Sequence, residues 1–183
     1  RVAHSKTTDP VAEMSAIWGT KLFDEENAAV IPLAVADGRA AIAYVRKHAD
    51  EMKLDPNRIG IMGFSAGGTV TASTAFKYNN ENKPNFIAPV YAFFPREMWG
   101  AVADDAPSAF IVAASDDALG LAPHSVDFYN QWLANKREAE LHMYSRGGHG
   151  FGMRVQNFPS DKWIERFGEW LNTKEKKKKS KYD

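Results

Sequence analysis

The sequence has no cysteine among its 183 residues. Disulfide bonds and thiolate metal sites are therefore excluded, although this absence does not decide the cellular compartment. An excess of charge is also missing, because lysine plus arginine and aspartate plus glutamate both number 23. This balance gives no electrostatic reason to expect nucleic acid or an acidic membrane as a partner.

Long apolar runs and internal repeats are absent as well. The longest apolar run, residues 86–94, has the length of a strand, whereas a membrane-spanning helix needs about 20 apolar residues. We therefore expect no membrane partner. Without repeats or a linker between two units, the sequence predicts a single domain over residues 1–173. Lysines dominate residues 174–183, which we expect to form a solvated basic tail.

Apolar patterning divides the chain into alternating helices and strands. Up to residue 33 the pattern is irregular, and we expect a loop with one short helix at residues 10–18. Further helices are expected at residues 37–52, 66–78, 123–135 and 159–172. Strands are expected at residues 58–64, 86–94, 109–114 and 139–145. This alternation predicts an α/β fold, with a mostly parallel sheet covered by helices on both faces.

Helical spacing also predicts which side chains the last two helices bury. For the helix at residues 123–135, the expected inner face consists of Val126, Tyr129 and Leu133. For the final helix, the expected inner face consists of Trp163, Phe167, Trp170 and Leu171.

A serine flanked by glycines stands where an expected buried strand meets an expected helix, in the sequence Gly-Phe-Ser-Ala-Gly at residues 63–67. A sharp strand-to-helix turn strains the serine backbone and disfavours side chains at Gly63 and Gly67. The helix amino terminus adds partial positive charge and free N–H groups. We therefore predict Ser65 as a nucleophile and the Ala66 N–H as an oxyanion donor, rather than a glycine-rich turn without chemistry.

Candidates for the partners of Ser65 follow the later strands. A serine nucleophile needs a base within hydrogen-bond reach, and that base needs an orienting carboxylate. Asp116 and Asp117 follow the strand at residues 109–114; we favour Asp117, one step further along, and assign Asp116 a loop or capping role. His149 follows the next strand in a flexible glycine-rich loop, while His124 is a weaker candidate that could line the pocket. The order serine, aspartate, histidine is the one described for α/β-hydrolases.

These segments resemble the small acetyl-esterase and lipase-like α/β-hydrolases, a family that includes carbohydrate and xylan esterases. The resemblance extends over residues 33–171 and is carried by DPNRIGIMGFSAGG (55–68), DDALGLAPHS (116–125) and GGHGFG (147–152). It implies triad roles for Ser65, Asp117 and His149, and a structural acidic position for Asp37. It also implies hydrolysis of small acyl esters, mainly acetyl groups on carbohydrate such as xylan, without a metal or other cofactor.

The chain departs from this family at its amino end. Family members carry several strands there and a glycine-rich loop that supplies the second oxyanion donor. Residues 1–36 show no such loop and contain only Gly19 as a glycine. We therefore expect an incomplete oxyanion hole, which typically costs about 10²–10³ in rate, and an exposed sheet edge. The missing segment is expected to be a separate chain, to have been removed by proteolysis, or to come from a partner protomer.

Three side chains near the expected site are candidates for substrate contacts. Trp99 follows the strand at residues 86–94, and Phe151 and Arg154 lie just beyond His149. Aromatic rings suit sugars, but each of these side chains is also compatible with ordinary packing.

Two other functions are compatible with the sequence. A peptidase of the prolyl-oligopeptidase type would use the same triad, usually with an additional large domain. A binding protein with the hydrolase fold would lack a complete oxyanion hole.

Overall fold

A computed structural model describes the backbone of residues 21–179 and the side chains of residues 28–174. The short helix predicted at residues 10–18 lies outside this range. The helices are α2 (Lys21–Lys47), α3 (Ala66–Thr74), α4 (Ala122–Ala134) and α5 (Trp163–Lys179), with 3₁₀ turns η1 (Arg96–Met98) and η2 (Pro159–Lys162). The strands are β1 (Ile61–Phe64), β2 (Phe86–Val90), β3 (Ser108–Ala114) and β4 (Ala139–Tyr144).

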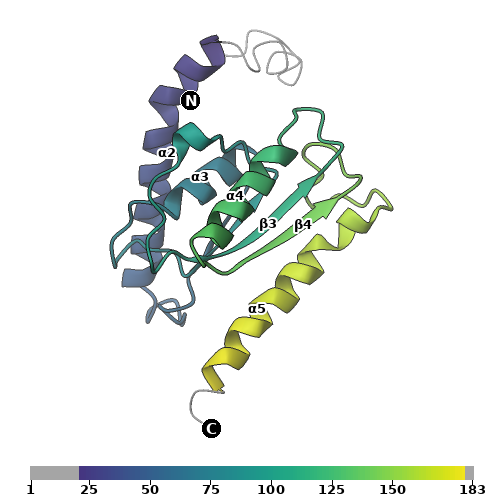
Figure 1. Cartoon of the computed structure of the whole chain (residues 1–183). Helices are drawn as coiled ribbons and strands as arrows, with labels where there is room; N and C mark the ends of the chain where they lie inside the picture. Colours follow the sequence, from purple (N-terminus) through teal and green to yellow (C-terminus); the bar gives the residue numbers. More distant parts are fainter. Residues whose placement is uncertain (1–20, 180–183) are drawn as a thin grey trace.

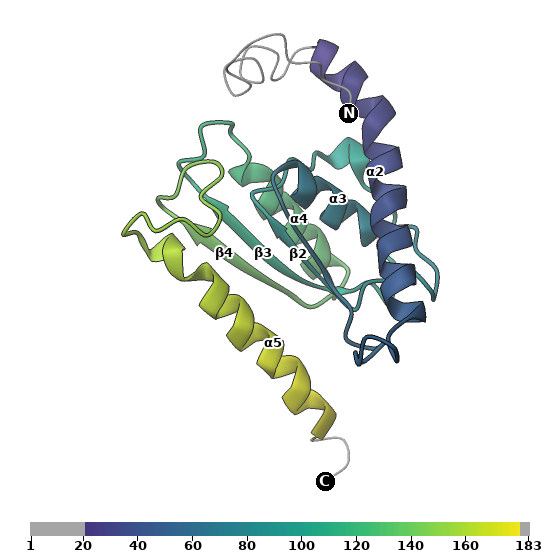
Figure 2. The same ribbon diagram turned by 180° about the vertical axis from the view of Figure 1, so that it is seen from behind.

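The four strands form one parallel sheet in the order β1-β2-β3-β4. Figures 1 and 2 show α3 and α4 on one face of the sheet and α5 on the other. Strand β3 lies inside the sheet, and all its residues from Ala109 to Ala114 are at most 1% exposed. The predicted parallel sheet with helices on both faces is therefore confirmed.

Successive side chains of the inner strands enter two separate hydrophobic layers. Phe110 and Val112 of β3 pack with Trp163, Phe167 and Trp170 of α5. On the opposite face, the layer consists of Ala72, Ala75, Phe76, Ile87, Phe94, Ala109, Ile111, Phe128 and Trp132. This alternation follows from the two-residue period of a strand. Packing on both faces fixes the positions of the strands. The candidate site lies at the carboxyl ends of these strands.

Helix α2 begins much earlier than the sequence pattern predicted. The expected loop up to residue 33 is wrong from Lys21 onward, because α2 runs through Pro32 to Lys47. An interior proline costs a helix about 3 kcal/mol, so tertiary contacts must offset it. The Arg39 guanidinium donates hydrogen bonds to the carbonyls of Ser73 and Phe76 at the end of α3. These contacts fasten α2 to α3.

Residues Ala28–Lys47 of α2 form a helix that is long and apolar enough to cross a membrane, judged by length and composition alone. This helix was not identified from the sequence, because only uninterrupted apolar runs were considered there. A core helix or a secretion signal has the same properties. Only Val35 and Ile42 of this segment are buried, whereas Leu33 is 67% exposed. The expected absence of a membrane partner therefore stays a prediction.

The buried face was predicted correctly for α5 but only in part for α4. For α4 the predicted face is wrong at Val126 and Leu133, which are exposed, whereas Tyr129 is partly buried against the layer that Phe128 and Trp132 enter. The Trp132 indole also donates a hydrogen bond to the Pro107 carbonyl at 2.9 Å, which fixes the rotation of the helix.

For α5 the predicted inner face is confirmed, since Trp163 and Trp170 are buried. Leu171 is partly buried against the same layer. The helix continues to Lys179, so part of the expected basic tail is helical.

Candidate active site

Ser65 occupies the turn between β1 and α3, as the sequence predicted. Its φ is 52°, in the left-handed region, which costs a non-glycine residue about 1–2 kcal/mol. Two backbone hydrogen bonds hold this conformation, from Ser65 N to Val90 O at 3.0 Å and from Thr69 N to Ser65 O at 3.1 Å. The turn is therefore fastened both to the end of β2 and to the first turn of α3.

The glycines around Ser65 have unequal roles. A Cβ at Gly63 would lie 2.1 Å from the backbone oxygen of Gly67, so Gly63 cannot carry a side chain without a backbone shift. The expectation that Gly67 must also be glycine is wrong, because a Cβ there would meet no atom within 4 Å. Gly68 is the second close approach, where a Cβ would lie 2.8 Å from the Ala92 Cβ.

Ser65, His149 and Asp117 are joined by two hydrogen bonds. Ser65 Oγ lies 2.9 Å from His149 Nε2, and His149 Nδ1 lies 2.9 Å from Asp117 Oδ2. The three residues follow β1, β4 and β3, and in a parallel sheet these strand ends meet at one edge. The structure thus brings together the three residues predicted as a triad.

The environment of the Asp117 carboxylate determines which nitrogen of His149 carries the proton. The Asp117 side chain is 0% exposed and that of His149 is 22% exposed. Asp117 Oδ1 also accepts a hydrogen bond from Leu119 N at 2.9 Å, so both carboxylate oxygens are engaged. Because the ionised carboxylate only accepts, it favours the His149 tautomer with the proton on Nδ1. Nε2 is then an acceptor that faces the Ser65 hydroxyl, as a general base requires.

The amino end of α3 offers N–H groups beside Ser65. No side chain caps this end by a hydrogen bond, and the first turn contains no acidic residue. Uncapped N–H groups at a helix amino terminus stabilise negative charge. The Ala66 N–H, one residue after Ser65, therefore stays our predicted oxyanion donor.

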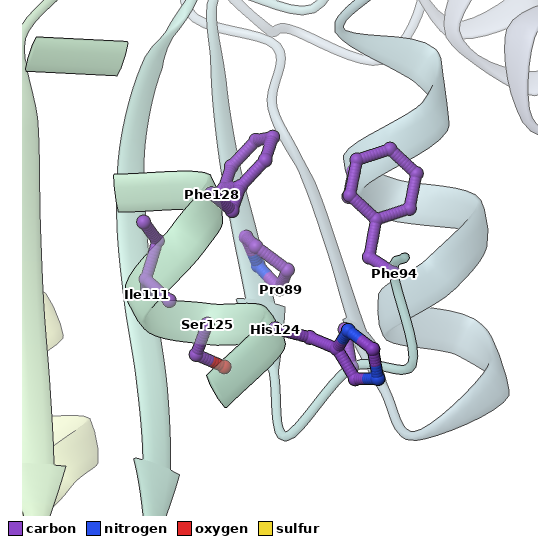
Figure 3. Close-up of a pocket in the computed structure, with 8 residues that line it drawn as sticks. Pro89, Phe94, Ile111, His124, Ser125 and Phe128 are labelled. Atoms are coloured by element: carbon purple, nitrogen blue, oxygen red, sulfur yellow. The ribbon is translucent and has the colours of Figure 1, made fainter. Parts of the chain in front are cut away.

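The two weaker candidates have other surroundings. Asp116 is exposed, and its Oδ1 accepts a hydrogen bond from Gly148 N at 2.7 Å rather than from the imidazole. His124 packs edge-on against Phe93 with ring centroids 5.2 Å apart, and burial lowers its pKa against the opposing effect of Asp127. His124 lines a pocket of only about 10 Å³ (Figure 3). That volume accommodates a single water at most, so it cannot receive an acyl or sugar group.

The loop at residues 147–152, here called the His149 loop, contains glycines that allow its backbone to adopt positive φ values. Gly148, Gly150 and Gly152 have φ values of 69°, 72° and 51°, which glycine adopts without strain. Side chains from outside the loop donate to three of its carbonyls: Gln156 to Gly147 O, Arg154 to Gly150 O and Trp163 to Gly152 O. The expected flexible loop is therefore a tethered one in the structure.

The two aromatic residues predicted to contact substrate pack against other parts of the fold. Phe151 is 2% exposed and belongs to the core layer beneath α5. Trp99 stacks on Phe94 and donates to its carbonyl at 3.2 Å. It lines a cleft of about 360 Å³ between α2 and α3, whose lining includes neither Ser65 nor His149.

Sequence reasoning missed Tyr91, whose ring centroid lies 5.1 Å from that of His149. Tyr91 is the first residue after β2, and its position at a strand end was the available signal. Among the side chains of residues 28–174, no group of three histidines, aspartates or glutamates is arranged to bind a metal ion.

Comparisons with known proteins agree with the fold. The BD-FAE family matches residues 23–98. An acetylxylan esterase of Xylanibacter ruminicola is 26% identical over 171 residues, covering 77% of this chain and 36% of that protein. The chain therefore spans about a third of the length of this curated relative.

Solved structures show the same architecture. An acetyl ester-xyloside bifunctional hydrolase from Caldicellulosiruptor lactoaceticus superposes with a TM-score of 0.67 at 23% identity, covering 76% of this chain and 65% of that one. The α/β hydrolase MGS-M1 from a Medee basin deep-sea metagenome library gives a TM-score of 0.65 at 20% identity, covering 76% and 63%. The predicted resemblance is thereby confirmed at the level of the fold.

Proposed function

We propose that this chain, an α/β-hydrolase that fits the acetyl-esterase-like family, carries the catalytic triad of a serine ester hydrolase. The observation that carries the proposal is the pair of 2.9 Å hydrogen bonds linking Ser65, His149 and Asp117. A serine is activated when its hydroxyl lies within reach of a base that a third group orients. The described residues supply all three at the ends of three strands.

Each residue has a defined step in the proposed reaction. Ser65 Oγ attacks the ester carbonyl while its proton passes to His149 Nε2, and Asp117 stabilises the resulting imidazolium. The Ala66 N–H donates to the carbonyl oxygen as it gains negative charge. The intermediate collapses to an acyl-serine, and the leaving alcohol takes the proton from Nε2. Water then attacks the acyl-serine with the same base and releases the carboxylic acid.

The proposed substrate is a small acyl ester, with an acetyl group on a carbohydrate such as xylan as the specific proposal. The support comes from the relatives, since one is an acetylxylan esterase and another is an acetyl ester-xyloside hydrolase. Neither the small pocket beside His124 nor the cleft at Trp99 is lined by Ser65.

We expect the second oxyanion donor to come from a segment outside residues 21–179. Strand β1 pairs with β2, and among residues 21–179 no strand covers its other edge. A sheet edge is a ready pairing site for another segment. We propose that a further strand-forming segment pairs with this edge and completes the oxyanion hole.

A fluorophosphonate probe tests the proposed nucleophile directly. We expect the purified chain to form a covalent adduct at Ser65, detected by peptide mass spectrometry, and expect none in Ser65→Ala. An unlabelled Ser65 would instead favour a binding protein with the hydrolase fold. Hydrolysis of p-nitrophenyl acetate compared with a peptide p-nitroanilide separates an esterase from a peptidase.

A further inference from the structure

The His149 loop is anchored on its amino-terminal side by an aspartate outside the triad. Asp116 Oδ1 accepts a hydrogen bond from Gly148 N at 2.7 Å, one residue before the imidazole. Neighbouring Asp117 binds the ring itself through Oδ2. Two consecutive carboxylates after β3 therefore fix the same histidine, one through its side chain and one through its backbone.

A buried tyrosine anchors the loop on its carboxyl-terminal side. The Tyr91 hydroxyl lies beside Gly152, since a Cβ at Gly152 would be 3.6 Å from it. The ring packs edge-on against His149 at 5.1 Å and against Phe151 at 4.8 Å. The side chain thus contacts both the imidazole and the loop residue three positions after it.

Tyr91 occupies this place at a conformational cost. Its φ is 37°, a region in which a bulky residue is strained by about 1–3 kcal/mol. The Tyr91 N–H still donates to Val112 O at 2.7 Å, so the strained backbone remains fastened to β3. Burial raises the pKa of the Tyr91 hydroxyl, so the group stays neutral across the ordinary range of pH. Strain at a residue beside a catalytic group is commonly linked to its function.

We propose that Asp116 and Tyr91 are positioning residues that fix the His149 imidazole between Asp117 and Ser65 from the two sides of its loop. This inference rests on the proposed serine-hydrolase function. A misplacement of about 1 Å can cost about 10²-fold in rate, whereas the glycines at 148, 150 and 152 permit such movement when the anchors are removed. A purely structural role would lower stability and leave the rate per folded molecule unchanged.

Matched variants separate the two roles. Asp116→Ala removes the acceptor for Gly148 N, whereas Asp116→Asn keeps an oxygen in its place. Tyr91→Leu removes the ring and the hydroxyl, whereas Tyr91→Phe removes only the hydroxyl. Asp50→Ala is the control, because Asp50 is an exposed carboxylate in the segment that follows α2.

The first readout is the rate at which a fluorophosphonate labels Ser65, normalised to folded protein by circular dichroism. We expect labelling to be about tenfold slower in Asp116→Ala and about 10–100-fold slower in Tyr91→Leu. Tyr91→Phe should be slowed by a smaller factor, Asp116→Asn should regain most of the lost rate, and Asp50→Ala should match the wild type. Unchanged labelling in Asp116→Ala and Tyr91→Phe would overturn the inference, even if Tyr91→Leu does not fold.

The second readout does not depend on reaction at Ser65. The His149 Nδ1 proton, hydrogen-bonded to Asp117, gives a downfield resonance in proton NMR spectra recorded in water. We expect this resonance to broaden or move upfield in Asp116→Ala and Tyr91→Phe, and to be retained in Asp116→Asn and Asp50→Ala. If the wild type does not react with the probe, the proposed function fails, and the resonance still decides the positioning role. An unaltered resonance in Asp116→Ala and Tyr91→Phe contradicts that role.

Discussion

The turn at Ser65 follows β1 and the His149 loop follows β4, the two outer strands of the sheet, and turn and loop meet at the hydrogen bond between Ser65 and His149. At the serine turn, backbone segments approach so closely that a Cβ at Gly63 would lie 2.1 Å from a backbone oxygen. In the His149 loop, a Cβ at Gly148 or Gly150 would meet no atom within 4 Å. Close packing therefore restricts the turn at Gly63, whereas the His149 loop has open space at Gly148 and Gly150 and receives hydrogen bonds from side chains outside it.

This difference indicates how each region should respond to substitution. In the serine turn, the effect of an added side chain depends on the space at each position, which differs between Gly63 and Gly67. The His149 loop should position its imidazole less precisely with each hydrogen bond that is removed. The change should be gradual, since each bond contributes only about 0.5–1.5 kcal/mol. The predictions below compare the two regions.

The largest effect is expected where both regions depend on one buried group. Asp117→Asn keeps the shape of the site but removes the carboxylate that selects the His149 tautomer. The rate of Ser65 labelling should fall about 10⁴-fold, as for the equivalent change in other serine hydrolase triads. Stopped-flow labelling measures it, and a loss smaller than tenfold would show that Asp117 does not orient the imidazole.

A second large effect is expected at the packed turn. Gly63→Ala forces a backbone shift against Gly67 O, and overpacking of this kind costs about 1–3 kcal/mol. We expect urea unfolding to show a loss near the upper end of this range, with Ser65 labelling reduced in the folded fraction. Unchanged stability in Gly63→Ala would mean that the turn is not held by packing.

A smaller effect is expected from the same change in the loop. Gly150→Ala places a Cβ in open space at a φ of 72°, so the cost is backbone strain of about 1–2 kcal/mol without a clash. We predict a modest loss of stability and a slower labelling rate. Thermal unfolding and labelling measure both, and a loss equal to that of Gly63→Ala would remove the distinction between the two regions.

The smallest effect is expected at the second glycine of the serine motif. Gly67 lies in α3, is exposed and has open space around it. Alanine is favoured over glycine inside a helix by about 0.5–1 kcal/mol. Gly67→Ala should therefore be slightly stabilised in urea unfolding and should label at the wild-type rate. A loss as large as that in Gly63→Ala would restore the expectation that both glycines are needed.

These cases show what could be predicted from the sequence. The serine turn and the strands were identifiable because small residues and buried runs have local patterns. The start of α2 was missed because Pro32 indicates a break, and the contacts of Arg39 that offset it are 34 and 37 residues distant. The space around Gly67 depends on tertiary packing and has no local signature.

The site divides in the same way. Ser65, Asp117 and His149 could be named from strand order, because each follows its own strand. Tyr91 also follows its own strand but was missed, because the packing of its ring on His149 has no local sequence pattern. The second role proposed for Asp116 could not be predicted either. Asp116 Oδ1 reaches Gly148 N across 32 residues of sequence, and no residue pattern predicts that bond.

The central claim is that Ser65 forms an acyl intermediate with His149 as its base. Acid quenching during hydrolysis of p-nitrophenyl acetate, followed by peptide mass spectrometry, tests it most directly. The account predicts an acetyl group on the peptide containing Ser65, absent in Ser65→Ala and strongly reduced in His149→Ala. An acetyl group found only on other residues, or found equally in His149→Ala, would contradict it.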